Sequence, residues 1–157
     1  MSTMTRRAAL LGFVALVAAC GDPHSSRETG RFDPPLHVNE TPQLRRLINT
    51  YADKNKVPRL LVHRIITRES QHRPGARNGP YYGLMQIMPE TARGMGFRGS
   101  DQALLDAETN LKYAVKYLRG AWLLSNGSHD TAVKWYSKGY YYEAKRRGML
   151  VETGLRG

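Results

Sequence analysis

Glu69 is the residue whose setting in this sequence best suits proton transfer. It follows Leu61 and Ile65 at intervals of four and Ile66 at an interval of three, so the helical period predicts it on an apolar helix face. It also lies near the expected C-terminal end of that helix, where the backbone dipole disfavours an anion. Burial and dipole both raise the pKa of a carboxyl group. A carboxyl kept protonated in an apolar wall is a general acid of the kind that protonates a glycosidic oxygen.

A structural role explains the same pattern equally well. A carboxylate paired with Arg68 or Arg73 would also lie at such a position, and buried ion pairs perturb pKa values too. Periodicity alone therefore leaves both roles for Glu69 open. Several other acids read instead as caps or helix starts: Glu90, Asp101, Asp106, Glu108 and Asp130.

The elements expected to position Glu69 are mainly helices. Capping residues, prolines and apolar spacing predict helix starts in six places, at Thr41, Pro58, Pro89, Asp106, Ser128 and Tyr140. The helix that carries Glu69 is expected to end at Pro74 and Gly75. The stretch from there to about Met88 is rich in Gly, Pro, Tyr and Asn. We therefore predict a mainly α fold with at most a small β-hairpin in this stretch.

Length and charge limit the classes of protein that this chain can belong to. It has 157 residues, of which 41% are hydrophobic and 24% charged, as in an ordinary globular domain. The net charge is +11, which attracts polyanions such as nucleic acid, anionic lipid or an acidic cell-wall polymer. We find no RNA- or DNA-binding motif and expect no nucleic-acid partner.

The N-terminus is typical of an export signal. Arg6 and Arg7 precede an apolar run from residue 8 to residue 19, which is too short to cross a bilayer permanently. The run ends at Cys20, the only cysteine, and residues 16–21 resemble the bacterial lipobox. Ordinary cleavage after a plain signal peptide is the alternative. A lone thiol at this place has no disulfide partner, which favours lipidation.

Three segments follow from these observations. Residues 1–19 are predicted to be a signal peptide, residues 20–40 a lipidated N-terminus and flexible tether, and residues 41–157 one domain. We expect a periplasmic, membrane-anchored monomer. Gly21, in place of the aspartate often linked to inner-membrane retention, favours the outer membrane.

The domain resembles the soluble lytic transglycosylase family, which is related in fold to goose-type lysozyme. The resemblance covers about residues 57 to 140 and depends on short segments in a fixed order. These are Glu69-Ser70, Gly83-Leu84-Met85-Gln86-Ile87-Met88-Pro89, Thr91-Ala92, Asn110-Leu111, Tyr117-Leu118, Ala132-Val133, Trp135-Tyr136 and Gly139. Two positions depart from the family pattern, because Ser137 replaces the usual Asn and Tyr82 replaces a small residue.

The resemblance implies a lysozyme-like fold and cleavage of the bond that follows N-acetylmuramic acid in peptidoglycan. Glu69 would first act as the acid and then, as the base, take a proton from the muramoyl 6-hydroxyl, which closes a 1,6-anhydro ring without water. The implied substrate-binding residues are Ser70, Gly83, Gln86, Met88, Asn110 and Tyr136.

Some of these positions have a second explanation. Tyr136 matches the family tyrosine that hydrogen-bonds the catalytic carboxyl, but it would also suit a core position. Asn110 either orients the groove or only occupies a first helical turn. Ser70 either binds the acid or an N-acetyl group, or is an ordinary helix-terminal residue.

Two other functions compete with transglycosylation. A muramidase would act on the same substrate with water as the nucleophile, and a cell-wall-binding lipoprotein would have lost catalysis. Neither a transglycosylase nor these alternatives needs a cofactor here, and we expect none. His63 and His72 have no partner at metal-ligand spacing in the sequence, so we also predict no metal site.

Overall fold

The computed structural model describes residues 34–156, so the predicted signal peptide, Cys20 and most of the tether lie outside the described residues. The elements are α1 (Pro42–Lys54), α2 (Arg59–Ser70), β1 (Arg77–Asn78), β2 (Tyr81–Tyr82), α3 (Pro89–Gly94), the 3₁₀ helix η1 (Asp101–Leu105), α4 (Ala107–Leu123), α5 (His129–Lys138) and α6 (Tyr141–Arg146). The mainly α fold with one small hairpin is confirmed. Between residues 34 and 156, every helix is too short or too polar to cross a membrane.

Side-chain caps explain where three of the helices begin. The Thr41 hydroxyl accepts a hydrogen bond from the Leu44 N–H at 3.1 Å, with Pro42 in the first turn. Asp106 accepts from the Thr109 N–H at 2.8 Å, and Ser128 accepts from the Thr131 N–H at 3.2 Å. These bonds satisfy backbone donors that a helix N-terminus leaves without an intrahelical partner. All three starts agree with the sequence prediction.

The end of α2 differs from the prediction. The helix stops at Ser70, four residues before Pro74, because Gln71 adopts a left-handed conformation with φ of 52°. The Gln71 N–H then bonds back to the Ile66 carbonyl at 3.0 Å and closes the helix. His72 is also left-handed, with φ of 59°, so the chain turns sharply after the helix. Glu69 consequently lies in the last turn.

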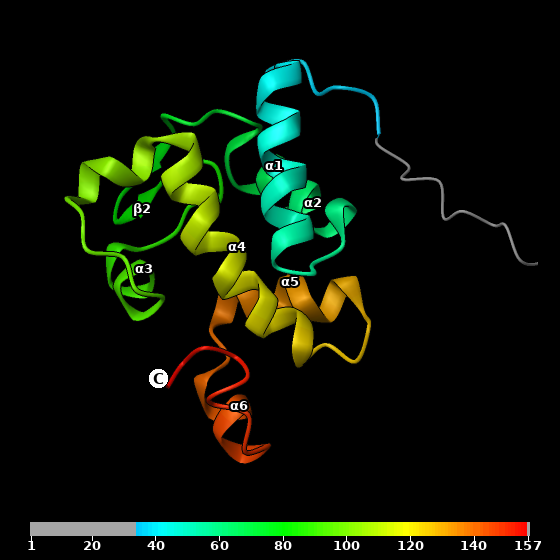
Figure 1. Cartoon of the computed structure of the whole chain (residues 1–157), viewed down its shortest axis with the longest axis vertical. Coiled ribbons are helices and arrows are strands. Elements are labelled where there is room, and N and C mark those ends of the chain that lie inside the picture. Colours follow the sequence, from blue (N-terminus) through cyan, green and yellow to red (C-terminus); the bar gives the residue numbers. More distant parts are fainter. Residues whose placement is uncertain (1–33, 157) are drawn as a thin grey trace, which may run out of the picture. The chain divides into compact units, whose positions relative to one another are not determined.

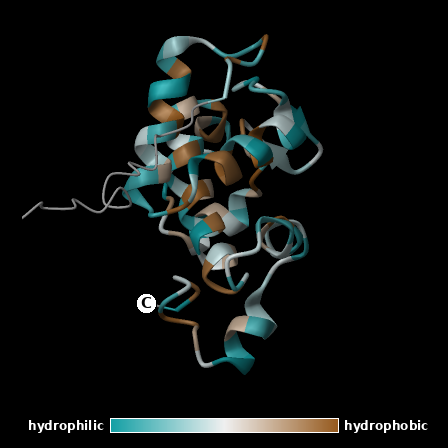
Figure 2. Cartoon of the chain, turned by 90° about the vertical axis from the view of Figure 1, so that its right-hand side faces the viewer, coloured by the Kyte–Doolittle hydropathy of each residue, from teal (hydrophilic) through white to brown (hydrophobic). Residues whose placement is uncertain are grey.

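The helix α4 is the centre of the packing (Figure 1). It contacts α1, α3, α5 and η1, while α2 packs against both α1 and α5. Hydrophobic residues lie on the inward faces of these helices (Figure 2). Leu61 and Ile65 of α2 and Leu111 and Leu118 of α4 are fully buried in this core. Burial of each such side chain contributes roughly 1.5–3 kcal/mol, which fixes α2 and therefore the direction of Glu69.

The small hairpin lies between α2 and α3 in the chain. Arg77 is opposite Tyr82 and Asn78 is opposite Tyr81 in the antiparallel pair, and Tyr82 forms a further bridge with Ile87. This second pairing continues the hairpin into the Gly-Leu-Met-Gln segment. The loop that follows Glu69 is thereby folded back towards α2, where Leu84 contacts Ser70.

Candidate active site

Glu69 faces a hollow at the C-terminal end of α2. Its side chain is 22% exposed, and its carboxyl oxygen lies 3.6 Å from Nε of Arg68, which is itself largely in solvent. The hollow has a volume of about 340 Å³ and is lined by Arg68, Glu69, Asn78, Tyr81, Gln86, Tyr136 and Ser137. Burial raises the pKa of Glu69, and the charge of Arg68 only partly opposes this. The helical pattern predicts the same direction.

A second hollow of about 310 Å³ continues from the first. Tyr81, Gln86, Tyr136 and Ser137 border both, so the two hollows form one groove. The other lining residues of the second hollow are Ile87, Met88, Thr91, Tyr117, Lys138 and Gly139. Within the described part of the chain, Glu69 is the single carboxylate among the residues that line this groove.

Gln86 lies where the two hollows meet. Its side-chain nitrogen donates to the carbonyls of Ala76 at 3.1 Å and Gly83 at 2.9 Å. Both amide hydrogens are therefore used inside the loop, and the amide oxygen is the atom that can accept a hydrogen bond from a ligand. Met88 lines the second hollow with a partly buried side chain. The structure thus places both of these predicted residues at the groove.

Tyr136 also borders both hollows, but its hydroxyl has a different partner from the one predicted. The hydroxyl donates to the Met85 carbonyl at 2.8 Å, and a phenol has only one hydrogen to donate. The expected donation to the Glu69 carboxyl is therefore wrong. Burial and then the nearby Glu69 charge raise the pKa of Tyr136 well above its ordinary value, so the phenol stays neutral beside the acid.

Ser70 contacts the loop instead of a substrate. Its side chain is buried, and its hydroxyl donates to the Leu84 carbonyl at 2.7 Å, with a longer contact to the Ile66 carbonyl at 3.3 Å. Neither hollow includes Ser70 among its lining residues, so the structure adds no support for the predicted contact with substrate. Ser70 instead attaches the end of α2 to the Gly-Leu-Met-Gln segment.

Asn110 is a second residue that supports the groove from behind. It is fully buried at the start of α4, and its amide nitrogen donates to the carbonyls of Tyr82 and Leu104, each at 2.8 Å. Its amide oxygen accepts from the Met85 N–H at 3.0 Å. The amide therefore orients the loop, as one of the two sequence interpretations proposed, but it does not line the groove as the implied substrate-binding role requires.

Gly83 allows this close packing. A Cβ atom at this position would lie 2.2 Å from the Asn110 amide nitrogen and 2.4 Å from the Leu104 carbonyl oxygen, and φ is +73°. The predicted close approach of the backbone is present, but it is towards Asn110 and not towards the substrate groove.

Several groove residues were not assigned to the groove from the sequence. Arg68, Asn78, Thr91, Tyr117 and Lys138 line it, although they come from five different elements and share no spacing. Ser137, at the family's usual Asn position, borders both hollows, and its hydroxyl donates to the Val133 carbonyl at 3.0 Å. Of these residues, only Arg68 could have been assigned to the groove from the sequence, because it is adjacent to Glu69.

Comparison with known proteins identifies one matching family. The sequence model of the transglycosylase SLT domain family matches residues 46–147, which include every groove residue and all of α2, α4 and α5. No match was found among curated proteins or among solved structures.

Gly83→Ala should destabilise the fold severely. The added methyl group would overlap Asn110 and Leu104 and would strain a left-handed backbone, at a combined cost of about 2–5 kcal/mol in the free energy of unfolding. Urea unfolding monitored by circular dichroism measures this. Gly75→Ala is the matched control, because a Cβ at Gly75 meets nothing within 4 Å, and it should stay within about 1 kcal/mol of wild type. Equal stabilities of the two variants would contradict the packing described here.

Arg68→Gln should raise the pKa of Glu69 further. Removing this cation leaves the effect of burial unopposed, and an exposed pair of this kind contributes about 0.2–1 kcal/mol, or roughly 0.2–0.7 pH unit. An NMR titration of the carboxyl carbon gives the pKa directly. Arg64→Gln removes the same charge one turn earlier, where the guanidinium pairs with Asp130 outside the groove, and should leave the Glu69 pKa unchanged. A lower pKa in Arg68→Gln would refute the assigned role of Arg68.

Proposed function

The chain belongs to the transglycosylase SLT family, whose enzymes act on peptidoglycan, and from this premise we propose that it is an active lytic transglycosylase with Glu69 as its acid and base. The product proposed is a glycan end that carries 1,6-anhydro-N-acetylmuramic acid. The observation that carries the proposal is a lone, largely buried carboxyl of raised pKa in a groove.

The proposed reaction balances with one carboxyl group. The protonated Glu69 donates its hydrogen to the glycosidic oxygen, and the bond from that oxygen to the muramoyl anomeric carbon breaks. The resulting Glu69 carboxylate then removes the proton from the muramoyl 6-hydroxyl. The 6-oxygen bonds to the anomeric carbon, the anhydro ring closes, and Glu69 is protonated again without consuming water.

The raised pKa suits both steps of this reaction. Burial favours the protonated form of the Glu69 carboxyl, which suits a general acid, and the same burial makes the carboxylate formed after donation a stronger base. Glycosidases that activate water normally use a second carboxylate about 5–9.5 Å from the first. The groove residues supply none besides Glu69 in the described part of the chain, which favours ring closure over hydrolysis.

The groove also has the contacts expected for a polysaccharide that carries carboxylate groups. Tyr81 is 42% exposed where the two hollows meet and offers a ring face for a sugar. Gln86 offers a hydrogen-bond acceptor. Arg68 and Lys138 place a cation beside each hollow, which suits the carboxylates of the lactyl group or stem peptide.

Mass spectrometry of digested sacculi tests the proposed reaction. The wild-type chain should release muropeptides with anhydro ends, which are one water lighter than the reducing ends that a muramidase gives. Glu69→Gln should lower the release at least about 1,000-fold, because the neutral amide can neither donate the proton nor take it back. Its melting temperature should not fall, since the change removes a partly buried ionisable group and keeps its shape.

The other outcomes identify the competing functions. Reducing ends from the wild-type chain would make it a muramidase. Binding to sacculi without any release, in a folded wild-type chain, would make it a cell-wall-binding protein. Full activity in Glu69→Gln would show that another group is the acid.

We also propose that this enzyme works in the periplasm from a lipid anchor on Cys20, with the outer membrane favoured. The support is the sequence of residues 6–21, with its basic pair, apolar run and single cysteine. The wild-type chain should partition into the detergent phase in Triton X-114 extraction of the producing cells, and Cys20→Ala should not. Identical partitioning of the two chains would refute the anchor.

A further inference from the structure

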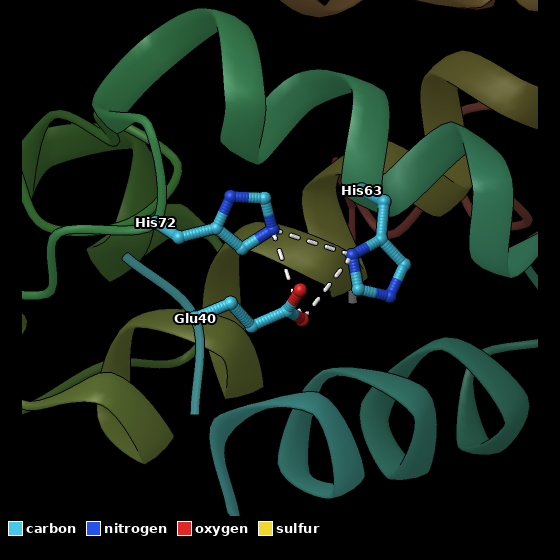
Figure 3. Close-up of side chains that lie close together, drawn as sticks. All are labelled: Glu40, His63 and His72. Atoms are coloured by element: carbon cyan, nitrogen blue, oxygen red, sulfur yellow. Dashed lines mark hydrogen bonds and ion pairs between the residues drawn. The ribbon is translucent and has the colours of Figure 1, made fainter. Parts of the chain in front are cut away.

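A second cluster of titratable side chains lies outside the groove, where α2 and the turn after it meet the segment before α1. Glu40 precedes α1, His63 lies in the middle of α2, and His72 follows the sharp turn after that helix. All three side chains are buried, with exposures of 0%, 6% and 2%. Figure 3 shows them pointing towards one another from three separate parts of the chain.

The three distances between their polar atoms are similar. His63 Nδ1 lies 3.4 Å from His72 Nε2, and Oε1 of Glu40 lies 3.6 Å from the first and 3.8 Å from the second. These contacts are long for hydrogen bonds, which are usually 2.7–3.2 Å, roughly. Three atoms at these separations share a point about 2.1 Å from each, which is the bond length of Zn²⁺ to nitrogen and oxygen ligands.

We infer that Glu40, His63 and His72 form a binding site for a divalent transition metal ion, with Zn²⁺ as the best fit. Two imidazoles and a carboxylate are a donor set that Zn²⁺ favours, and a water molecule completes four-coordination in sites of this kind. Within the described residues, these three are the group whose ligand atoms all lie within 4.8 Å of one another.

Neighbouring residues orient two of the three ligands, His63 and Glu40, through hydrogen bonds. His63 Nε2 lies 3.2 Å from the Asn49 amide oxygen, which favours a hydrogen on Nε2 and leaves the Nδ1 lone pair directed at the cluster. Arg45 holds the Glu40 carboxylate by two hydrogen bonds, of 2.7 Å to Oε1 and 2.6 Å to Oε2. A carboxylate oxygen has two lone pairs, so Oε1 can accept from Arg45 and still bind a metal ion.

The electrostatic state of the cluster is compatible with metal binding. Burial raises the pKa of Glu40, but the hydrogen bonds from Arg45 and from the His37 backbone N–H lower it more, so this carboxyl is ionised. Burial lowers the pKa of His72, which keeps its imidazole neutral and able to donate a lone pair. The proposed ligand atom of His72 is Nε2, whereas Nδ1 of the same ring is buried without a hydrogen-bond partner among the described residues, and a metal ion on Nε2 would not change this.

The site would join three parts of the chain, which are the segment before α1, the middle of α2 and the turn that follows α2. His63 lies six residues before Glu69 and His72 lies three residues after it. The two consecutive left-handed residues Gln71 and His72 bring the second imidazole back towards α2. Spacing along the chain predicts no metal site, because the carboxylate comes from 23 residues before His63.

Metal titration of the purified full-length chain tests this site without any peptidoglycan. All samples carry Cys20→Ser, so that the single thiol cannot bind the metal, and are first stripped with a chelator. We expect about one Zn²⁺ per chain by elemental analysis, intense visible absorption when Co²⁺ occupies the same low-coordinate site, and a higher melting temperature with Zn²⁺. Glu40→Gln and His72→Ala should each weaken Co²⁺ binding about 100-fold or more.

His129→Ala is the matched control, since this imidazole packs against Trp122 away from the cluster, and it should bind Co²⁺ as the wild type does. Absence of saturable binding to the wild-type chain overturns the proposal and leaves an ion-pair network of Glu40, Arg45 and the histidines. Unchanged binding in folded Glu40→Gln and His72→Ala also overturns it. If those two variants do not fold, the wild-type Co²⁺ spectrum decides alone, because absorption typical of six oxygen ligands would exclude this site. None of these results depends on whether the groove is active.

Discussion

Three buried side chains form hydrogen bonds to the loop at Leu84 and Met85, and the shape of the groove depends on these bonds. Ser70 at the end of α2 donates to the Leu84 carbonyl, and Tyr136 of α5 donates to the Met85 carbonyl. Asn110 at the start of α4 accepts from the Met85 N–H. The backbone of two adjacent loop residues is thus hydrogen-bonded by three different helices. Each bond is buried, so losing one would leave an unsatisfied polar group as well as a missing contact. This explains why several residues typical of the family lie behind the groove and not in it.

The packing of this loop against the helices also affects the pKa of Glu69. Loop and helices together cover most of the Glu69 side chain, and this burial raises its pKa despite the adjacent Arg68. Tyr136 contributes a neutral ring beside the carboxyl while its hydrogen is directed at the loop. The groove therefore contains a carboxyl group of raised pKa, and the Arg68 charge opposes this shift only in part. This setting suits the proton donation by Glu69 that we propose. The proposed reaction involves no metal ion.

The packed face of helix α2 carries two separate polar groups among its apolar residues. Glu69 faces the groove, whereas His63 faces Glu40 and His72 in a buried cluster. Val62 and Ile66 lie between them on the packed face of the helix, are fully buried, and keep the two polar side chains apart. The groove and the cluster are thereby held in one rigid element, although their chemistry is separate. A metal ion in the cluster would act on the position of the helix and not on the substrate.

The sequence by itself determined the helical framework and the placing of Glu69, the acid that we propose, on a covered helix face, because both depend on local spacing. Apolar periodicity placed Glu69 on the face that is covered, and the caps at Thr41 and Asp106 begin helices where predicted. The family match over residues 46–147 confirms the resemblance drawn from short segments. Only the tertiary structure decided which groups Ser70, Gly83 and Asn110 contact, and which group accepts the hydrogen bond of the Tyr136 hydroxyl. Their contacts join residues 14 to 51 positions apart through an irregular loop, whose path no periodicity specifies. The meeting of Glu40, His63 and His72 was undetectable for the same reason, since it depends on a left-handed turn after α2 and on how α1 packs.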